Sequence, residues 1–194
     1  MKRLVIGISG ASGANLGITL LRLLRDNAEW ETHLVCSEAG RTTIACETAH
    51  SFDDVAALAD VVHEPSNIGA SIASGSFKTE GMAVIPCSMK SLAAIAHGYA
   101  DNLLTRAADV TLKERRKLVL LARETPLHSG HLRNMLSAAE LGAVIMPPVM
   151  THYNHPKSIE DMEMHIVCKV LNEFGIDAPQ YRRWEGLPDH AQGS

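Results

Sequence analysis

Short apolar runs alternate with amphipathic stretches along most of the chain. Leu4–Ile8 is a continuous apolar run, and the stretch after it carries leucines at the spacing of one helix face, at Leu16, Leu20, Leu21, Leu23 and Leu24. Four more apolar runs predict further strands, at Thr32–Cys36, Met82–Pro86, Leu118–Leu121 and Ala143–Met146. Runs that are apolar on both faces and separated by helices are typical of a parallel sheet covered on both sides.

This alternation predicts an α/β fold, a single doubly wound and mainly parallel sheet flanked by helices, with flavodoxin-like or Rossmann-like strand order. No repeat, low-complexity stretch or Pro-rich linker divides the 194 residues, so we expect one domain spanning 1–194. In such folds ligands bind beyond the carboxyl ends of the strands. The residues that follow each predicted strand are therefore the candidates for a functional site.

Composition excludes several classes of protein. Hydrophobic residues make up 46% and charged residues 21%, as in ordinary globular proteins, and the net charge of −4 gives no electrostatic footprint for nucleic acid. No apolar run reaches the roughly 18 residues that span a bilayer, and the run after MKR breaks into glycines, which favours a buried strand over a secretion signal. The four cysteines include no CxxC pair and indicate reduced thiols. We expect a cytoplasmic protein with no nucleic-acid or membrane partner.

The turn after the first strand is rich in small residues, Gly7-Ile8-Ser9-Gly10-Ala11-Ser12-Gly13-Ala14. Its glycines permit the close approach of a ligand, and the following helix offers unpaired N–H groups to an anion. The spacing is neither the GxGxxG of dinucleotide-binding folds nor the Gly-Lys-Ser/Thr of a P-loop, and neither serine sits in a GxSxG motif. On spacing alone, phosphate binding is only slightly favoured over a simple turn between strand and helix.

Similar turns follow other predicted strands. Ser37 ends the second strand, Pro86-Cys87-Ser88-Met89-Lys90-Ser91 follows the third, and Arg123-Glu124-Thr125-Pro126 follows the fourth. Each serine taken alone is more simply explained as the N-cap of a helix. Because these turns converge on one edge of a parallel sheet, together they predict a cradle for a phosphorylated cofactor.

A basic cluster lies on both sides of the fourth predicted strand and comprises Arg106, Lys113, Arg115, Arg116 and Arg123. The helix dipole favours cations at a helix C-terminus, which explains at least two of Lys113, Arg115 and Arg116 as a solvated helix end. Arg106 and Arg123 flank less polar sequence and are expected to be held against an anion or a carboxylate.

No residue pattern predicts a metal site. Asp53-Asp54 begins a polar, helix-starting segment, and Asp60 lies too far along the chain to complete a DDxxD motif. Two histidine pairs have no accompanying carboxylate, His128 with His131 and His152 with His155. We therefore expect no metal.

In their order along the chain, several motifs together resemble the UbiX family of flavin prenyltransferases, also described as Pad-type aromatic-acid decarboxylases. The motifs are GISGASGA at 7–14, CET at 46–48, SGS at 74–76, PCSMKSLAAIAHGYADNLLTRAADVTLKERRKLVLLARETPL at 86–127 and HLRNML at 131–136. The likeness continues from YNHP at 153–156 to Arg183-Trp184 and covers nearly the whole chain. The short segment between Glu47 and Ser74 resembles the form found beside hydroxyarylic-acid decarboxylases of catabolic operons.

The resemblance implies an enzyme that joins the allyl carbon of dimethylallyl phosphate to N5 of reduced FMN, closes a ring onto C6 and releases phosphate. The product, prenylated FMN, implies a partner decarboxylase of the UbiD type. The resemblance further implies a metal-independent transferase that forms a large homo-oligomer, expected to be a dodecamer. We expect the C-terminal tail from about residue 176 to pack on a neighbouring subunit.

The resemblance also implies roles for individual positions. Those that match the FMN-binding positions are Gly10, Ala11, Ser12, Ser37, Ser88, Met89, Lys90, Ser91 and Arg123. Those that match the positions around the allyl phosphate, some of them from neighbouring subunits, are Ser74, Arg106, Lys113, Glu124, Tyr153 and Lys169. Fixed cations and hydroxyls of these types stabilise a departing phosphate.

Three residues are the expected catalytic groups. Lys113 stabilises the departing phosphate, Glu124 protonates it or receives a proton as the ring forms, and Glu47 takes the proton lost when C6 regains aromaticity. A structural ion pair between Arg123 and Glu124 is the competing interpretation. Trp184 is expected to offer an aromatic face to the allyl cation, with packing of the tail on a neighbour as an equal alternative.

The sequence departs from the usual family pattern at several positions. Lys169 replaces the arginine for the allyl phosphate, which keeps the charge but loses the bidentate fork. Arg133 stands where many relatives carry glutamate, and His128 and Gly130 also differ. These changes affect the expected substrate affinity more than the fold or the reaction class.

Three other functions compete with prenyl transfer. Flavin-dependent cysteine decarboxylases of similar fold carry a PxMNxxMW signature, whereas this chain has PPVMTHYNHP at 147–156. A non-catalytic FMN-binding or delivery subunit of an aromatic-acid decarboxylase needs no Glu47, Lys113, Glu124 or Tyr153, so their joint presence favours catalysis. Direct decarboxylation ranks last, because the sequence supplies no electron sink beyond flavin.

Overall fold

A computed structural model describes residues 1–179, 181, 184 and 186 of the chain. Within these residues a sheet of six strands forms the centre, with β1 (Lys2–Ile8), β2 (Trp30–Cys36), β3 (Val61–His63), β4 (Gly81–Cys87), β5 (Lys117–Ala122) and β6 (Val144–Ile145). Every hydrogen-bonded pair is parallel, and the order is β3-β2-β1-β4-β5-β6. This confirms the predicted doubly wound sheet and gives it the strand order of the Rossmann type.

The order of the strands fixes where a ligand can bind. The chain builds outward from β1 to β3 and then returns to place β4 on the other side of β1. A crevice therefore opens between the carboxyl ends of β1 and β4, the switch point at which doubly wound folds bind ligands. The turns at 9–13 and 86–91 lie at this point.

The strand prediction missed only β3. The five predicted runs coincide with β1, β2, β4, β5 and β6. β3 is three residues long, lies at the edge of the sheet and is partly exposed, so its apolar signal is short.

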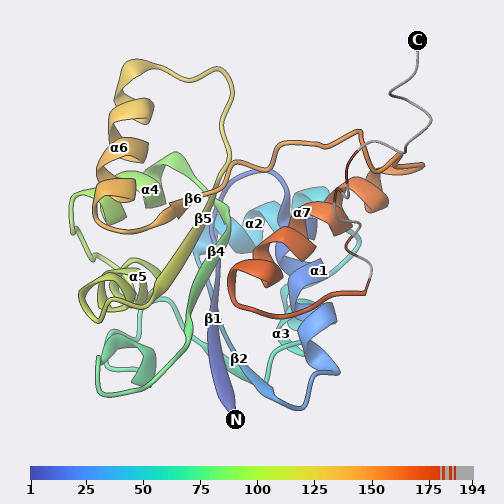
Figure 1. The fold of residues 1–194 in the computed structure, drawn as a ribbon. Helices are drawn as coiled ribbons and strands as arrows, with labels where there is room; N and C mark the ends of the chain where they lie inside the picture. Colours follow the sequence, from blue (N-terminus) through green and yellow to red (C-terminus); the bar gives the residue numbers. More distant parts are fainter. Residues whose placement is uncertain (180, 182–183, 185, 187–194) are drawn as a thin grey trace.

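Helices cover both faces of the sheet (Figure 1). One face carries α1 (Ala14–Arg25), α2 (Glu38–Glu47), α3 (Phe52–Ala56) and α7 (Ile159–Glu173). The other carries α4 (Met89–Ala96), α5 (Leu103–Lys113), α6 (Ser129–Glu140) and the short 3₁₀ helix η1 (Ser71–Ala73). In the described part of the chain, the helices are all too short or too polar to span a membrane.

Each face of the sheet has its own hydrophobic core. Leu4, Ile6 and Ile8 of β1 are fully buried against α1 and α7, whereas Val5 points to the opposite face and packs under α4 and α5. This alternation is the period of a strand, and each buried aliphatic side chain of this kind contributes about 1.5–3 kcal/mol. Two layers of helices are thereby held apart by the sheet.

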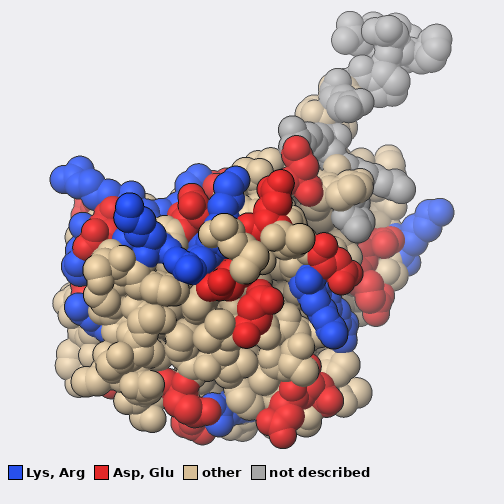
Figure 2. Space-filling model, turned by 90° about the horizontal axis from the view of Figure 1, so that it is seen from below, with Lys and Arg blue, Asp and Glu red and all other residues tan. Residues whose placement is uncertain are grey.

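Charge is mixed on the surface where the strands begin. Figure 2 views the molecule from below Figure 1, the side on which β1 starts, and shows Lys and Arg interspersed with Asp and Glu around a broad uncharged area. A surface that binds nucleic acid would instead gather Lys and Arg side chains into one patch. The described part of this face shows no such continuous basic surface.

A polar cluster with the buried His33 at its centre joins β1, β2 and β3. His33, only 3% exposed, contacts Glu31 Oε1 through Nε2 at 2.7 Å and His63 Nε2 through Nδ1 at 3.0 Å, and Arg3 donates to the same carboxylate at 2.9 Å. The Phe77 ring lies edge-on to His33 and beneath Arg3. Burial lowers the pKa of His63, and the nearby charge of His33 lowers it to a smaller extent. This cluster was not predicted from the sequence.

We predict that His63 makes the protein less stable in acid. In the unfolded chain His63 takes up a proton near its ordinary pKa of 6.5, whereas the lowered pKa of the folded state delays protonation, so falling pH favours unfolding. The expected loss is at most about 1.4 kcal/mol for each pH unit below that value. Urea unfolding from about pH 7 to about pH 5, at fixed protein concentration, should give a flatter pH dependence for His63→Gln.

The matched control is the exposed His152, changed to glutamine. Equal slopes for the wild type and His63→Gln would show that His63 does not contribute to the acid sensitivity.

Candidate functional site

A cavity of about 500 Å³ lies at the carboxyl edge of the sheet, between the N-termini of α2, α4 and α5. Each of these helices begins with a side-chain cap. Ser37 accepts from Gly40 N at 3.1 Å, Ser88 from Ser91 N at 3.2 Å, and Asn102 from Thr105 N at 3.1 Å. Three helix dipoles thus direct their positive ends at one space, which favours an anionic ligand.

The cavity brings together five of the nine predicted cofactor-binding residues. Gly10, Ser37, Ser88, Lys90 and Ser91 line it. The sequence did not point to its other lining residues, which are Glu38, Ala39, Pro65, Ser66, Ala94, Asp101, Asn102, Leu104 and Thr105. Most of these belong to the opening turns of α2 and α5 or to the segment after β3, so only the fold shows that they share a space.

Close backbone contacts hold the crevice in shape. A Cβ atom at Gly10 would lie 2.4 Å from the Cβ of Ala39, and one at Gly40 would lie 2.6 Å from the carbonyl oxygen of Ile8. The buried Ser9 hydroxyl donates to Pro86 O at 3.0 Å and accepts from Ser88 N at 2.8 Å. The ends of β1 and β4 and the start of α2 are therefore fixed to one another at the switch point.

Glu47, predicted as a catalytic base, lies at the N-terminus of α1. Its Oε2 accepts from Gly13 N at 2.8 Å and Ala14 N at 3.2 Å. Gly13, at the N-cap with φ 106°, has no side chain to cap the helix, so Glu47 caps it from the end of α2. This capping role was not foreseen, because the partners are more than 30 residues apart.

The environment of Glu47 favours its ionised form. Partial burial raises the pKa of the Glu47 carboxyl, but hydrogen bonds from the Ser12 hydroxyl and the Gly13 and Ala14 amides, with the charge of Arg123, hold it below the ordinary value. An ionised carboxylate is the form that can accept a proton. Ser12, Glu47 and Arg123, all predicted site residues, thus lie together around the start of α1.

Arg123 and Glu124 follow β5 as predicted and are both exposed. The Arg123 amide donates to Cys87 O at 3.0 Å, and Glu124 Oε1 accepts from Thr125 N at 3.0 Å. Among the residues that the structure describes, no ion pair joins these two side chains. The interpretation of the two as a structural ion pair therefore has no support.

The remaining cofactor positions do not line the cavity. Ala11 belongs to the turn before α1. Met89 is the first residue of α4 and packs partly against the core beneath that helix.

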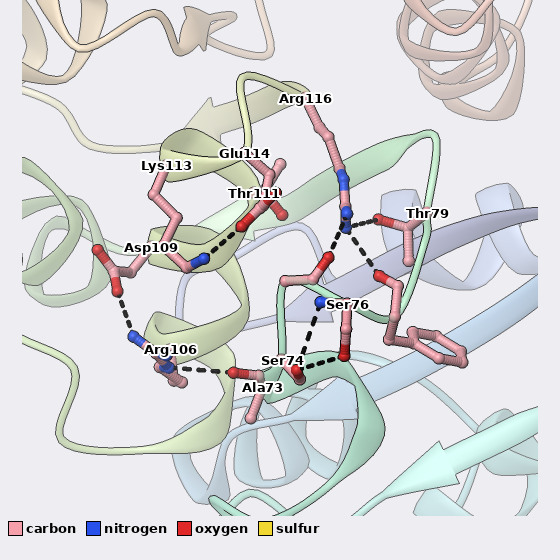
Figure 3. Close-up of polar contacts among 12 residues, drawn as sticks. Ala73, Ser74, Ser76, Thr79, Arg106, Asp109, Thr111, Lys113, Glu114 and Arg116 are labelled. Carbon is pink, nitrogen blue, oxygen red and sulfur yellow. Dashed lines mark hydrogen bonds and ion pairs between the residues drawn. The ribbon is translucent and has the colours of Figure 1, made fainter.

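A second group of predicted residues lies around the end of α5 (Figure 3). Arg106 donates from Nε to Ala73 O at 3.2 Å and pairs through Nη1 with Asp109 at 2.7 Å, while Lys113 forms an ion pair with Glu114. The Ser74 hydroxyl is 2.9 Å from that of Ser76. Ser74, Arg106 and Lys113 are therefore neighbours.

Arg116 holds the 74–77 loop in place beside this group. Its Nη2 donates to Gly75 O at 2.6 Å and its Nη1 to Phe77 O at 2.8 Å (Figure 3). The sequence allowed Arg116 to be a solvated cation at a helix end, but its guanidinium binds carbonyl groups of the loop. Lys113 lies in the last turn of α5, where the helix dipole favours a cation.

A third group lies at α7. The Tyr153 hydroxyl is 3.3 Å from His165 Nε2, the rings of Tyr153 and Trp184 are 5.6 Å apart, and Lys169 Nζ lies 3.5 Å from Glu173. Burial and the neighbouring Tyr181 raise the pKa of Tyr153, against the opposing charge of Lys169. Tyr153, Trp184 and Lys169 are therefore brought together.

The second and third groups are separated by the sheet. α5 and α7 cover opposite faces of the sheet (Figure 1), and two separate hydrophobic cores lie between them. Apart from Glu124, the predicted phosphate-binding residues thus fall into two groups, or candidate half-sites, on opposite faces of the sheet.

Metal-ligating side chains do not gather in the described part of the chain. No group of three or more His, Cys, Asp or Glu side chains there is arranged to hold a metal ion. His128 and His131 stack with ring centroids 3.6 Å apart, and His128 Nδ1 accepts backbone N–H groups.

Comparison with known proteins identifies the family. The Flavoprotein family model matches residues 1–171. "Flavin prenyltransferase UbiX" of Escherichia coli K12 is 57% identical over 188 residues, which cover 96% of this chain and 100% of the relative. The chain belongs to the UbiX family of flavin prenyltransferases. A probable UbiX-like flavin prenyltransferase of Sedimentibacter hydroxybenzoicus is 55% identical over 187 residues, covering 96% of this chain and 99% of the relative.

Solved structures of UbiX proteins share the fold throughout. A dodecameric FMN-dependent UbiX-like decarboxylase from E. coli O157:H7 has a TM-score of 0.93 and 53% identity, covering 95% of this chain and 100% of that one. AnUbiX (PadA1), in complex with FMN and dimethylallyl pyrophosphate, has a TM-score of 0.94 and 49% identity, covering 96% and 99%. The peptidyl-cysteine decarboxylase EpiD, at 18% identity and a TM-score of 0.60, shares the fold alone. The resemblance and the fold class predicted from the sequence are confirmed.

Replacing Glu47 with glutamine is expected to lower the free energy of unfolding at neutral pH by about 1 kcal/mol, because an amide oxygen accepts weaker hydrogen bonds than a carboxylate. The lowered pKa of Glu47 means that its contribution is present above the ordinary value of 4.5 and is lost as the pH falls through the folded value. Urea unfolding at about pH 7 and about pH 3 should therefore show a difference that shrinks in acid.

Glu140→Gln, which removes an exposed carboxylate of α6, is the control. A Glu47→Gln difference of the same size at both pH values would contradict the charged cap.

Proposed function

We propose that the protein joins a dimethylallyl group from dimethylallyl phosphate to N5 and C6 of reduced FMN and so makes prenylated FMN. The observation that carries the proposal is the cavity between three helix N-termini at the switch point. It lies in a chain that is 57% identical to the flavin prenyltransferase UbiX of E. coli.

The cavity suits the phosphate end of FMN. Serine hydroxyls and the N-termini of α2, α4 and α5 supply donors for a phosphate, and Gly10 lets a ligand approach the backbone. Gly10, Ala11, Ser12, Ser37, the Ser88–Ser91 turn and Arg123 are the proposed FMN-binding residues. Bound reduced FMN supplies the nucleophilic N5 and C6 atoms of the reaction.

The two half-sites suit the departing phosphate of the prenyl donor. Breaking the allylic C–O bond builds negative charge on phosphate, which fixed cations and hydroxyls stabilise. Arg106, Lys113 and Ser74 provide them on the α5 face, and Tyr153 and Lys169 on the α7 face. Trp184 is proposed to face the allyl cation, next to Tyr153.

These half-sites lie on opposite faces of the sheet. We propose a homo-oligomer in which the α5 face of one protomer meets the α7 face of a neighbour, so that neighbouring subunits complete each site. A dodecamer, as in the UbiX-like protein from E. coli O157:H7, is the proposed assembly. The tail from about residue 176 is proposed to pack on a neighbouring subunit; most of it lies outside the described residues.

Proton handling is proposed to fall to the two glutamates near Arg123. The ionised Glu47 can accept the proton released when C6 regains aromaticity. Glu124, exposed at the end of β5, protonates the leaving phosphate or receives a proton as the ring forms. We propose no metal for these steps, since fixed cations carry the charge.

Prenylated FMN would be consumed by a decarboxylase of the UbiD type, the proposed partner. The four cysteines form no disulfide in the described part of the chain, which supports the proposed location in the reducing cytoplasm.

The test is anaerobic incubation of the purified protein with reduced FMN and dimethylallyl phosphate, followed by mass spectrometry of the extracted flavin. We expect a mass gain of one prenyl unit that needs the protein and survives a chelator. Bound but unmodified FMN, with dimethylallyl pyrophosphate also tried, would refute catalysis and favour the alternative, a non-catalytic FMN-binding or delivery subunit.

Lys169→Arg is expected to lower the KM for dimethylallyl phosphate by about threefold, because a guanidinium can bind phosphate through two N–H groups, while kcat stays within about twofold. Steady-state kinetics of flavin prenylation measures both. Lys117→Arg is the matched control, since Lys117 and Lys169 both pair with Glu173. An unchanged KM in Lys169→Arg would remove Lys169 from the donor site.

A further inference from the structure

The segment between β5 and α6 carries two of the proposed site residues, Arg123 and Glu124, and few hydrogen bonds hold it in place. Residues 123–127 are all exposed. At its start the Arg123 amide donates to Cys87 O at 3.0 Å, which ties the segment to β4. Within it, the described hydrogen bond is local, from Thr125 N to Glu124 Oε1 at 3.0 Å. The direction in which Arg123 and Glu124 point therefore depends on how the far end is held.

That far end is held by His128, the N-cap of α6. Its Nδ1 accepts from Gly130 N at 3.0 Å and from His131 N at 3.3 Å, while its backbone is extended, with φ −97° and ψ 167°. Two of the N–H groups that a helix start leaves unpaired are thereby satisfied. Histidine is not among the usual capping residues, and to accept these bonds its ring must be neutral, with its proton on Nε2.

Two neighbours keep the ring in this position. The His128 ring stacks on that of His131, with centroids 3.6 Å apart and an angle of 28° between the planes. A Cβ atom at Gly130 would lie 2.9 Å from Cε1 and 3.0 Å from Nδ1 of His128, so glycine leaves room for the ring. His128, Gly130 and His131 thus form one unit at the start of α6.

We infer that His128 is a positioning residue for prenyl transfer: by capping α6 it fixes the path of the four residues that separate it from Arg123. With the cap in place the segment is tied at both ends, to β4 at Arg123 and to α6 at His128. Without it, the first turn of α6 loses its anchor and Glu124 loses its fixed orientation. The inference rests on the proposed function, which supplies the roles of Arg123 and Glu124.

The experiment compares His128→Ala, which removes the cap, with His128→Asn, which substitutes a preferred capping residue. Gly130→Ala displaces the ring but leaves the imidazole in the chain. Ser51→Ala is the control, because the Ser51 side chain also caps a helix, accepting from Asp54 N at the start of α3, and has no proposed role in the reaction. Amide hydrogen exchange of the flavin-free protein reports the cap directly, and steady-state kinetics with reduced FMN and dimethylallyl phosphate reports its consequence.

We expect faster exchange at Gly130, His131, Arg123 and Thr125 in His128→Ala, with kcat about tenfold lower, because small misplacement of catalytic groups costs mainly rate. Gly130→Ala should behave like His128→Ala. His128→Asn should restore both the slow amide exchange and the wild-type kcat, and Ser51→Ala should leave kcat unchanged.

Faster exchange at Gly130 and His131 with a wild-type kcat would overturn the inference, as would a His128→Asn protein no better than His128→Ala. A wild-type protein that transfers no prenyl group would instead refute the proposed function itself, whatever the exchange data show.

Discussion

The site depends on the direct contact between the end of β1 and the first turn of α2. Gly10 and Gly40 make this contact possible, because a Cβ atom on either would overlap Ala39 or the carbonyl of Ile8. The placement of α2 then determines both ends of the site. Its start brings Ser37 to the cavity, and its end brings Glu47 to the N-terminus of α1. One backbone contact thus couples the anion-binding crevice to the carboxylate beside Arg123.

A second constraint comes from the sheet itself. Six parallel strands with a core on each face separate the residues at the end of α5 from those at α7. The proposed assembly brings these two sets of residues together across a subunit boundary. In the 74–77 loop, some residues hold the loop in place and others are left free to contact a ligand. Arg116 binds its carbonyls and Phe77 packs on the His33 cluster, which leaves the Ser74 and Ser76 hydroxyls at the surface.

Periodicity was sufficient for the fold, because buried parallel strands appear as continuous apolar runs. It failed at β3, whose three partly exposed residues carry too short a signal. The polar cluster at His33 was missed for another reason: its partners, Arg3 and His63, come from other strands, and only the pairing of β2 with β1 and β3 makes them neighbours. The same holds for the Glu47 cap of α1. Sequence reasoning located the hydroxyl-bearing turns, but individual roles such as those of Lys113 and Tyr153 came from the family resemblance.

The structure also reconciles two interpretations of the serines, one as helix caps and the other as ligand-binding groups. As single residues, Ser37 and Ser88 are best explained as helix caps, and both do cap helices, yet both line the cavity as well. The two roles use different parts of the hydroxyl group. A cap uses an oxygen lone pair to accept from the backbone, whereas a phosphate needs the O–H as a donor. At Ser88 that proton is directed to Ser91 Oγ at 3.1 Å, which leaves the Ser91 O–H as the donor for a bound anion. Capping therefore fixes the hydroxyls at the rim of the cavity, the condition under which they bind an anion without reorganising.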